Sequence, residues 1–132
     1  MGYVWAFVLT GAIFAAIDAV WLKATAGFYK KEFGGMLRLV PNFTAAIVFY
    51  LLYVLGVVVF VLEPSFGGGQ WWQVAIRGAA FGMVAYATYD LTNLATLKKW
   101  SVKVTVIDIV WGALVTGVSA ALAFVILKGW LF

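Results

Sequence analysis

The sequence contains no cysteine and no histidine, and only two of its 132 residues are proline. Without cysteine the chain forms no disulfide and has no thiolate for nucleophilic chemistry or metal binding. Without histidine it lacks the commonest general base and the usual ligand of zinc and haem. These absences exclude most of the catalytic repertoire, so we predict no metal site from ligand motifs, and the sequence names no cofactor.

Charge is scarce as well, since only 11% of the residues are charged and 66% are hydrophobic, with a mean hydropathy of +1.06. This composition excludes a soluble domain. Apolar stretches of the length needed to cross roughly 30 Å of hydrocarbon cover residues 3–22, 44–62, 72–97 and 104–127. We expect the first to be a retained helix and not a signal peptide, because Lys23 follows the apolar run instead of preceding it. We therefore predict an all-α membrane protein, a single four-transmembrane-helix bundle over residues 1–132.

The basic residues predict the orientation of this bundle. They concentrate in the first and third connections, whereas the second connection, residues 63–71, has none; the two groups are Lys23, Lys30, Lys31 and Arg38, and Lys98, Lys99 and Lys103. By the positive-inside rule both groups lie in the cytoplasm, which places both termini on the outer, periplasmic side. The net charge of +4 then indicates contact with anionic lipid headgroups and not with nucleic acid.

Two features leave more than one interpretation. Residues 24–40 carry aromatic side chains among lysines, which fits an interfacial helix broken at Gly34 and Gly35 as well as it fits a basic loop. Arg77 lies about one and a half turns inside the third span. We favour a side chain that snorkels towards the outer surface and Glu63 over a functional role.

The three aspartates all lie within predicted spans, and the topology gives them a common depth. Asp18 precedes Lys23 by five residues, Asp90 precedes Lys98 by eight, and Asp108 follows Lys103 by five. At 1.5 Å per residue these carboxyl groups lie roughly 7 to 12 Å inside the cytoplasmic boundary. Ionisable groups at such depth are costly and usually face a bundle interior or a cavity, which makes them candidates for a functional site.

Helical phase predicts what surrounds the aspartates. On the third helix a polar wedge spans about 120° and consists of Tyr86, Tyr89, Asp90, Asn93 and Thr96. On the fourth, small and polar residues share the face of Asp108, namely Thr105, Gly112, Thr116 and Ser119. Small residues of this kind, with Gly78 and Gly82, allow close helix packing in lipid. We therefore expect the aspartates to point inwards, towards one another.

The first and fourth helices share a local pattern in which an aspartate precedes a tryptophan by three residues, Asp18 with Trp21 and Asp108 with Trp111. An indole donates a hydrogen bond to a carboxylate and also forms the wall of a pocket. The predicted ligand- or proton-binding site is therefore acidic with aromatic walls, and its residues are Asp18, Asp90, Asp108, Asn93, Tyr86, Tyr89, Trp21 and Trp111. Carboxylates gathered in low dielectric need either a bound cation or bound protons. The alternative is that each aspartate only bonds to a neighbouring helix and stabilises the bundle.

With these residues in view, the chain resembles a family of small bacterial inner-membrane proteins known as domain of unknown function 2177. The resemblance covers nearly the whole length. It rests on Asp18-x-x-Trp21-Leu22 with Phe28-Tyr29, Pro41 with Phe49-Tyr50, Tyr86-x-x-Tyr89-Asp90-Leu91-Thr92-Asn93-x-Ala95-Thr96, and Asp108-x-x-Trp111-Gly112. It implies a four-helix protein of the bacterial inner membrane and supplies no activity.

Three functions remain open on the sequence. The first is a protein that binds or translocates a proton, a cation or a cationic small molecule near the cytoplasmic face. The second is a membrane-embedded enzyme acting on a lipid or isoprenoid, with the aspartates as general acids or as oxygen ligands of Mg²⁺. The third is a structural or accessory subunit. The expected partners are the lipid bilayer, a small cation or lipid ligand and, since small-residue faces permit it, further copies of the chain in a homo-oligomer.

Overall fold

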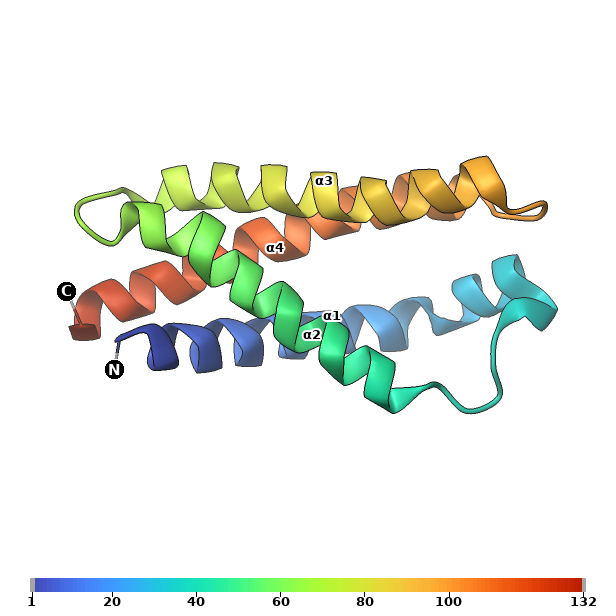
Figure 1. The fold of residues 1–132 in the computed structure, drawn as a ribbon, viewed down its shortest axis with the longest axis horizontal. Helices are drawn as coiled ribbons and strands as arrows, with labels where there is room; N and C mark the ends of the chain where they lie inside the picture. The colour runs from blue at the N-terminus through green and yellow to red at the C-terminus, as the bar shows by residue number, and fades with distance from the viewer. Residues whose placement is uncertain (1, 132) are drawn as a thin grey trace.

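The computed structural model describes residues 2–131, which form four long helices and no strand. The helices are α1 (Gly2–Phe33), α2 (Phe43–Val57), α3 (Trp71–Thr96) and α4 (Val102–Leu131). Consecutive helices run in opposite directions, and both termini lie at one end of the bundle (Figure 1). The prediction of an all-α bundle is thus confirmed. We call the end with the termini the terminal end, and the end with residues 34–42 and 97–101 the basic end.

Three of the four helical segments are long and apolar enough to cross a membrane, namely Gly2–Met36, Phe43–Ser65 and Val102–Trp130. The fourth, α3, carries Arg77 and Asp90 and is less apolar. It packs against α4, which diverges from it towards the terminal end (Figure 1), so its polar side chains have a helix beside them for most of its course.

The first helix is longer than predicted, because it continues past Leu22 to Phe33. The segment after Leu22 contains no proline, and its single glycine, Gly27, does not interrupt it. The helix ends where Gly34 adopts a left-handed conformation with φ of +54°, which glycine adopts without the steric cost that other residues incur. Residues 24–33 are therefore neither a separate interfacial helix nor a loop.

The other helix ends follow local signals. Pro41 precedes Asn42, whose side chain accepts a hydrogen bond of 3.1 Å from the Ala45 N–H and so caps α2. Gln70 and Gln73 form a capping box at the start of α3. The Ser101 hydroxyl accepts from the Val104 N–H at 3.1 Å and caps α4. After Val57, α2 widens into a π-helical turn, Val58–Leu62, and a 3₁₀ turn, Glu63–Ser65.

The closest packing joins α3 to α4 through glycines. A Cβ atom on Gly82 would collide with the Gly112 carbonyl, and one on Gly78 would lie 3.0 Å from the Gly117 Cα. Small residues let the two backbones approach this closely, and in lipid such contacts take the place of the hydrophobic effect. The predicted small-residue faces are therefore the α3–α4 interface.

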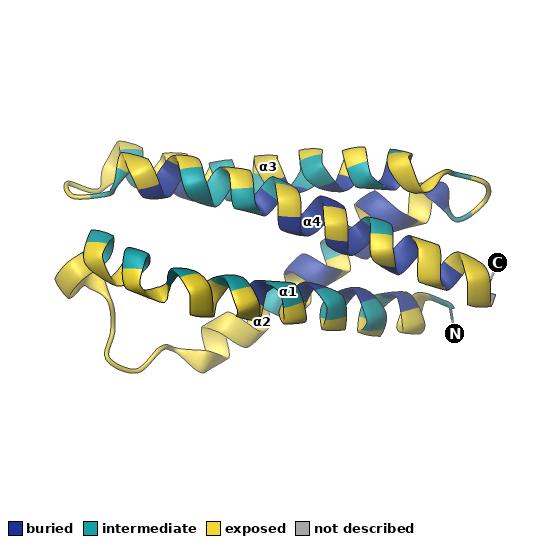
Figure 2. Ribbon diagram, turned by 180° about the vertical axis from the view of Figure 1, so that it is seen from behind, coloured by how far each residue is buried: buried dark blue, intermediate teal, exposed yellow. Residues whose placement is uncertain are grey.

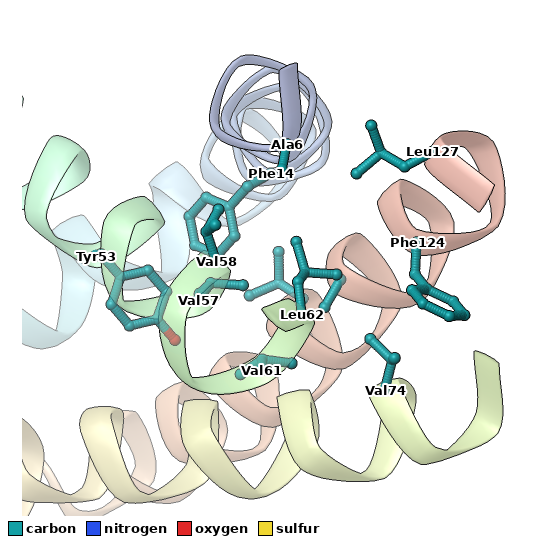
Figure 3. Close-up of a cluster of buried hydrophobic side chains, with 12 residues drawn as sticks. Ala6, Phe14, Tyr53, Val57, Val58, Val61, Leu62, Val74, Phe124 and Leu127 are labelled. Atoms are coloured by element: carbon teal, nitrogen blue, oxygen red, sulfur yellow. The ribbon is translucent and has the colours of Figure 1, made fainter. Parts of the chain in front are cut away.

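The hydrophobic core lies towards the terminal end, where side chains of all four helical segments meet (Figure 3). Its fully buried members include Ala6, Val61, Leu62 and Val74, at 0% exposure. Arg77 borders this region and donates hydrogen bonds to the Ser65 hydroxyl (2.9 Å) and the Val61 carbonyl (3.5 Å). Arg77 thus binds the end of α2, whereas the predicted partner Glu63 instead accepts from the Tyr3 hydroxyl at 3.3 Å.

The second helix crosses the bundle obliquely, and only its C-terminal half joins the core (Figure 1). Residues 43–49 are all exposed. Figure 2 shows this part of α2 in yellow, separated from the buried faces of α3 and α4. The basic end of the bundle is consequently less closed than the terminal end.

Candidate functional site

Asp18 lies on the inner face of α1 and is 9% exposed. It accepts two hydrogen bonds from other helices. The Tyr50 hydroxyl of α2 donates to Oδ2 at 2.6 Å, and the Trp111 indole N–H of α4 donates to Oδ1 at 3.0 Å. Hydrogen bonds to a carboxyl group from a phenol and an indole satisfy both of its oxygens. Asp18 therefore joins three helices at one point.

Asp108 and Asp90 form a pair of carboxyl groups from α4 and α3. Asp108 accepts a hydrogen bond of 3.1 Å from the Tyr29 hydroxyl of α1 and interacts with the carboxyl group of Asp90. Asp90 is fully buried, and neither of its oxygens forms a hydrogen bond of standard geometry. A buried carboxyl group without a donor is one of the costliest groups a fold retains, which marks this pair as a candidate for function.

Two tryptophans connect the carboxyl groups into one site. The Trp21 and Trp111 rings stack with centroids 4.2 Å apart and an interplanar angle of 7°. The Tyr86 ring lies against the Gly112 backbone, where any Cβ would overlap it. The glycine that follows Trp111 thus creates the space that Tyr86 occupies.

These side chains line a cavity of about 1020 Å³ that opens at the basic end. Its walls include the carboxyl groups of Asp18 and Asp108, four aromatic rings and the segment after α1. Its lining residues include Asp18, Trp21, Tyr29, Lys30, Arg38, Tyr86, Asp108 and Trp111. Carboxylates and the faces of aromatic rings both attract cations, whereas Lys30 and Arg38 give the opening the opposite charge.

A smaller cavity of about 350 Å³ lies on the other side of Tyr86 and Asp108, which line both spaces. Its remaining walls come from α2 and α3, namely Phe49, Tyr53, Ala85 and Tyr89. Exposed apolar residues flank it on the same helices, Leu52 at 63% and Val84 at 61% exposure. The site is therefore bordered by a second opening on a face that lipid would cover.

The structure brings together five of the eight predicted site residues around the large cavity, Asp18, Trp21, Tyr86, Asp108 and Trp111. Asp90 lines neither cavity but interacts with Asp108, which lines both. Tyr89 is 59% exposed and packs edge to face on Trp100, with centroids 5.8 Å apart, and Asn93 is half-buried and lines neither cavity. Of the predicted wedge on α3, Tyr86 thus lines both cavities and Tyr89 only the smaller one.

The three aspartates are not gathered around one point. Within residues 2–131 no three acidic side chains lie close enough together to bind one metal ion. The alternative in which Asp18, Asp90 and Asp108 bind Mg²⁺ jointly is thus not supported by the geometry.

Sequence reasoning missed two phenols that donate to the carboxylates. Tyr50 is part of the family resemblance, in the pair Phe49-Tyr50, but is not among the predicted site residues. Tyr29 was placed outside the spans, because the first helix was expected to end at Leu22. A continuous helix would have revealed it: Asp18, Thr25 and Tyr29 are seven and four residues apart, which keeps them on one face.

Apolar helices of spanning length that enclose a polar site define a multi-pass integral membrane protein of the helical-bundle class. The chain belongs to the family described as Predicted membrane protein (DUF2177), which matches residues 3–125. The resemblance based on the aspartate motifs is thereby confirmed. No curated protein and no solved structure matches the chain.

Proposed function

We propose that the protein binds a small organic cation in the cavity at the basic end. The observation that supports this most directly is that Asp18 and Asp108 line the same cavity as the stacked indoles of Trp21 and Trp111. Carboxylates neutralise an ammonium group, and aromatic faces attract it through their quadrupole by about 0.5 to 2 kcal/mol each. An inorganic cation would gain little from four aromatic rings.

The carboxyl pair supplies a proton to the same site. Two carboxyl groups that interact in low dielectric are not both ionised at low cost, so the pair of Asp90 and Asp108 holds one proton. Asp90 is fully buried and accepts no hydrogen bond, whereas Asp108 accepts one from the Tyr29 hydroxyl. A cation that enters beside Asp108 favours release of that proton, which links binding of a cation to transfer of a proton.

The cavity faces the cytoplasm of a bacterial cell in this proposal, with the protein in the inner membrane. Support comes from the seven basic residues of the first and third connections. The absence of cysteine makes the orientation easy to test, since one cysteine introduced at Gly67 or at Lys98 is the only thiol. A membrane-impermeant maleimide should label the first variant in intact spheroplasts and the second only after lysis. The reverse result would contradict this orientation.

The binding proposal is tested with dodecyltrimethylammonium as a probe. Native mass spectrometry of the full chain in maltoside micelles should show the probe bound to the wild type. Asp108→Asn and Asp18→Asn should each weaken binding about tenfold, the value of one charge-assisted contact of about 1.4 kcal/mol. Glu63→Gln at the terminal end is the matched control. Equal binding by all four proteins would refute the proposal.

A membrane-embedded enzyme is the second candidate, and one observation favours it. The proton-bearing pair of Asp90 and Asp108 adjoins Tyr86 and the lipid-facing cavity, where a general acid would meet an apolar substrate. Cells with and without the gene should then differ in at least one lipid class by mass spectrometry. Identical lipid profiles would favour binding over catalysis.

A further inference from the structure

The charges of the large cavity follow a fixed order along α1. Asp18 lines its inner part and Lys30 its opening, about 18 Å apart along the axis at 1.5 Å per residue. Arg38, in the segment that follows α1, adds a second positive charge to the opening. Lys30 and Arg38 are both exposed, so their charged groups are free to reorient towards a ligand. The cavity is therefore acidic inside and basic outside.

The smaller cavity is mainly apolar and adjoins the acidic part of the large cavity. It shares Tyr86 and Asp108 with the large cavity, and its other walls are three aromatic rings and Ala85. Its lining comes mostly from α2 and α3, and other apolar residues of these two helices, Leu52 and Val84, are exposed to the surroundings that lipid would fill. A ligand whose charged part occupies the large cavity would thus have space for an apolar chain that leads into the bilayer.

From this arrangement we propose that the ligand is a betaine-type amphiphile, in which an apolar chain carries first a cationic group and then, farther from the chain, an anionic group. The chain occupies the cavity between α2 and α3, the cation lies between Asp18 and Asp108, and the anion meets Lys30 and Arg38 at the opening. This inference rests on the proposed function and extends it from a cation to a class of zwitterion.

The order of charges separates this class from common phospholipid headgroups. In a phosphocholine the phosphate follows the chain and the ammonium group lies outermost. In this cavity the phosphate would then lie beside Asp108 and the ammonium group beside Lys30, and both contacts are repulsive. Like charges placed together in this way are how a site rejects a ligand of the same size and net charge.

The experiment compares two probes that differ mainly in this order, a dodecyl sulfobetaine and dodecylphosphocholine. Native mass spectrometry of the full chain in maltoside micelles should show that the wild type binds the sulfobetaine about fivefold more tightly, as expected for two exposed ion pairs of up to about 0.5 kcal/mol each. In the double variant Lys30→Gln/Arg38→Gln this preference should disappear. Lys98→Gln/Lys99→Gln is the matched control, because it removes two basic charges from the same end without touching the cavity lining, and it should keep the preference.

Binding of dodecyltrimethylammonium distinguishes a failure of the betaine inference from a failure of the proposed cation site. If the wild type binds it in an Asp108-dependent manner yet binds both zwitterions equally, the betaine inference is overturned and the cation site stands. A preference that survives in Lys30→Gln/Arg38→Gln also overturns the inference. If the cationic probe binds without dependence on Asp108 or Asp18, the proposed function itself is wrong. Both changed side chains are exposed, so the double variant should fold like the wild type.

Discussion

The two ends of the bundle are built on opposite principles. At the terminal end, apolar side chains such as Val61 and Leu62 are completely buried among all four helical segments (Figure 3). At the basic end the helices enclose a cavity of about 1020 Å³, and the carboxyl groups of α1, α3 and α4 gather beside it. The terminal end thus contains the packed core, and the basic end contains the candidate site.

This difference shows how a chain of 132 residues combines stability with a costly site. Backbone contact between α3 and α4 fixes these two helices through Gly78, Gly82, Gly112 and Gly117. Because this contact does not involve α1 or the first half of α2, these two segments can diverge at the basic end, where the large cavity lies. We expect changes at the terminal end and the α3–α4 contact to affect stability, and changes at the basic end to affect binding. Asp18 should affect both, because it also accepts hydrogen bonds from α2 and α4.

The most disruptive test of this division is Gly82→Leu. Its side chain would overlap the Gly112 carbonyl and the Thr116 hydroxyl, so the two backbones must separate, and we expect a loss of at least about 3 kcal/mol in the free energy of unfolding. The measurement is thermal unfolding in maltoside micelles, followed by retention of monodisperse protein. Gly27→Leu is the matched control, since nothing lies within 4 Å of a Cβ there. Equal stability of the two variants would mean that α3 and α4 do not pack through their glycines.

A smaller loss of stability is expected at Asp18, where hydrogen bonds join α1 to α2 and α4. Asp18→Ala leaves the Tyr50 hydroxyl and the Trp111 indole N–H without their acceptor, at a cost of about 2 kcal/mol. Asp18→Asn keeps one oxygen acceptor and should lose about half as much. The same unfolding assay measures both. If Asp18→Ala proved as stable as the wild type, Asp18 would not be the junction of α1, α2 and α4.

Hydropathy, charge asymmetry and small-residue spacing were enough to predict four helices, their order and the face of α4 that is buried. They act over one helix at a time, which is why they succeeded. The end of α1 was wrong because hydropathy reports where apolar sequence stops, whereas the helix stops only at Gly34, where the backbone changes conformation.

The candidate site could be predicted only in part. Depth and phase identified Asp18, Asp108 and their tryptophans, since each depends on the position along one helix. The phenols of Tyr29 and Tyr50 depend on how far α1 extends and how steeply α2 crosses the bundle (Figure 1), and neither is encoded in a local pattern. The exposure of Tyr89 could not be predicted either. The helical phase of α3 shows which residues share a face, but not where the neighbouring helices cease to contact that face.

The smallest effect should also have the opposite sign. Asp90 is fully buried, has no hydrogen-bond donor and interacts with Asp108. Asp90→Asn removes the need to hold a proton and offers an amide N–H to Asp108, so we expect a gain of about 0.5 to 1 kcal/mol in the free energy of unfolding. Thr88→Ala on the exposed side of α3 is the control, because the Thr88 hydroxyl bonds only to the Val84 carbonyl of its own helix. A more stable variant that no longer releases a proton when dodecyltrimethylammonium binds would show that Asp90 is retained for function at the expense of stability, whereas a clear loss of stability would place Asp90 with the residues that hold the bundle together.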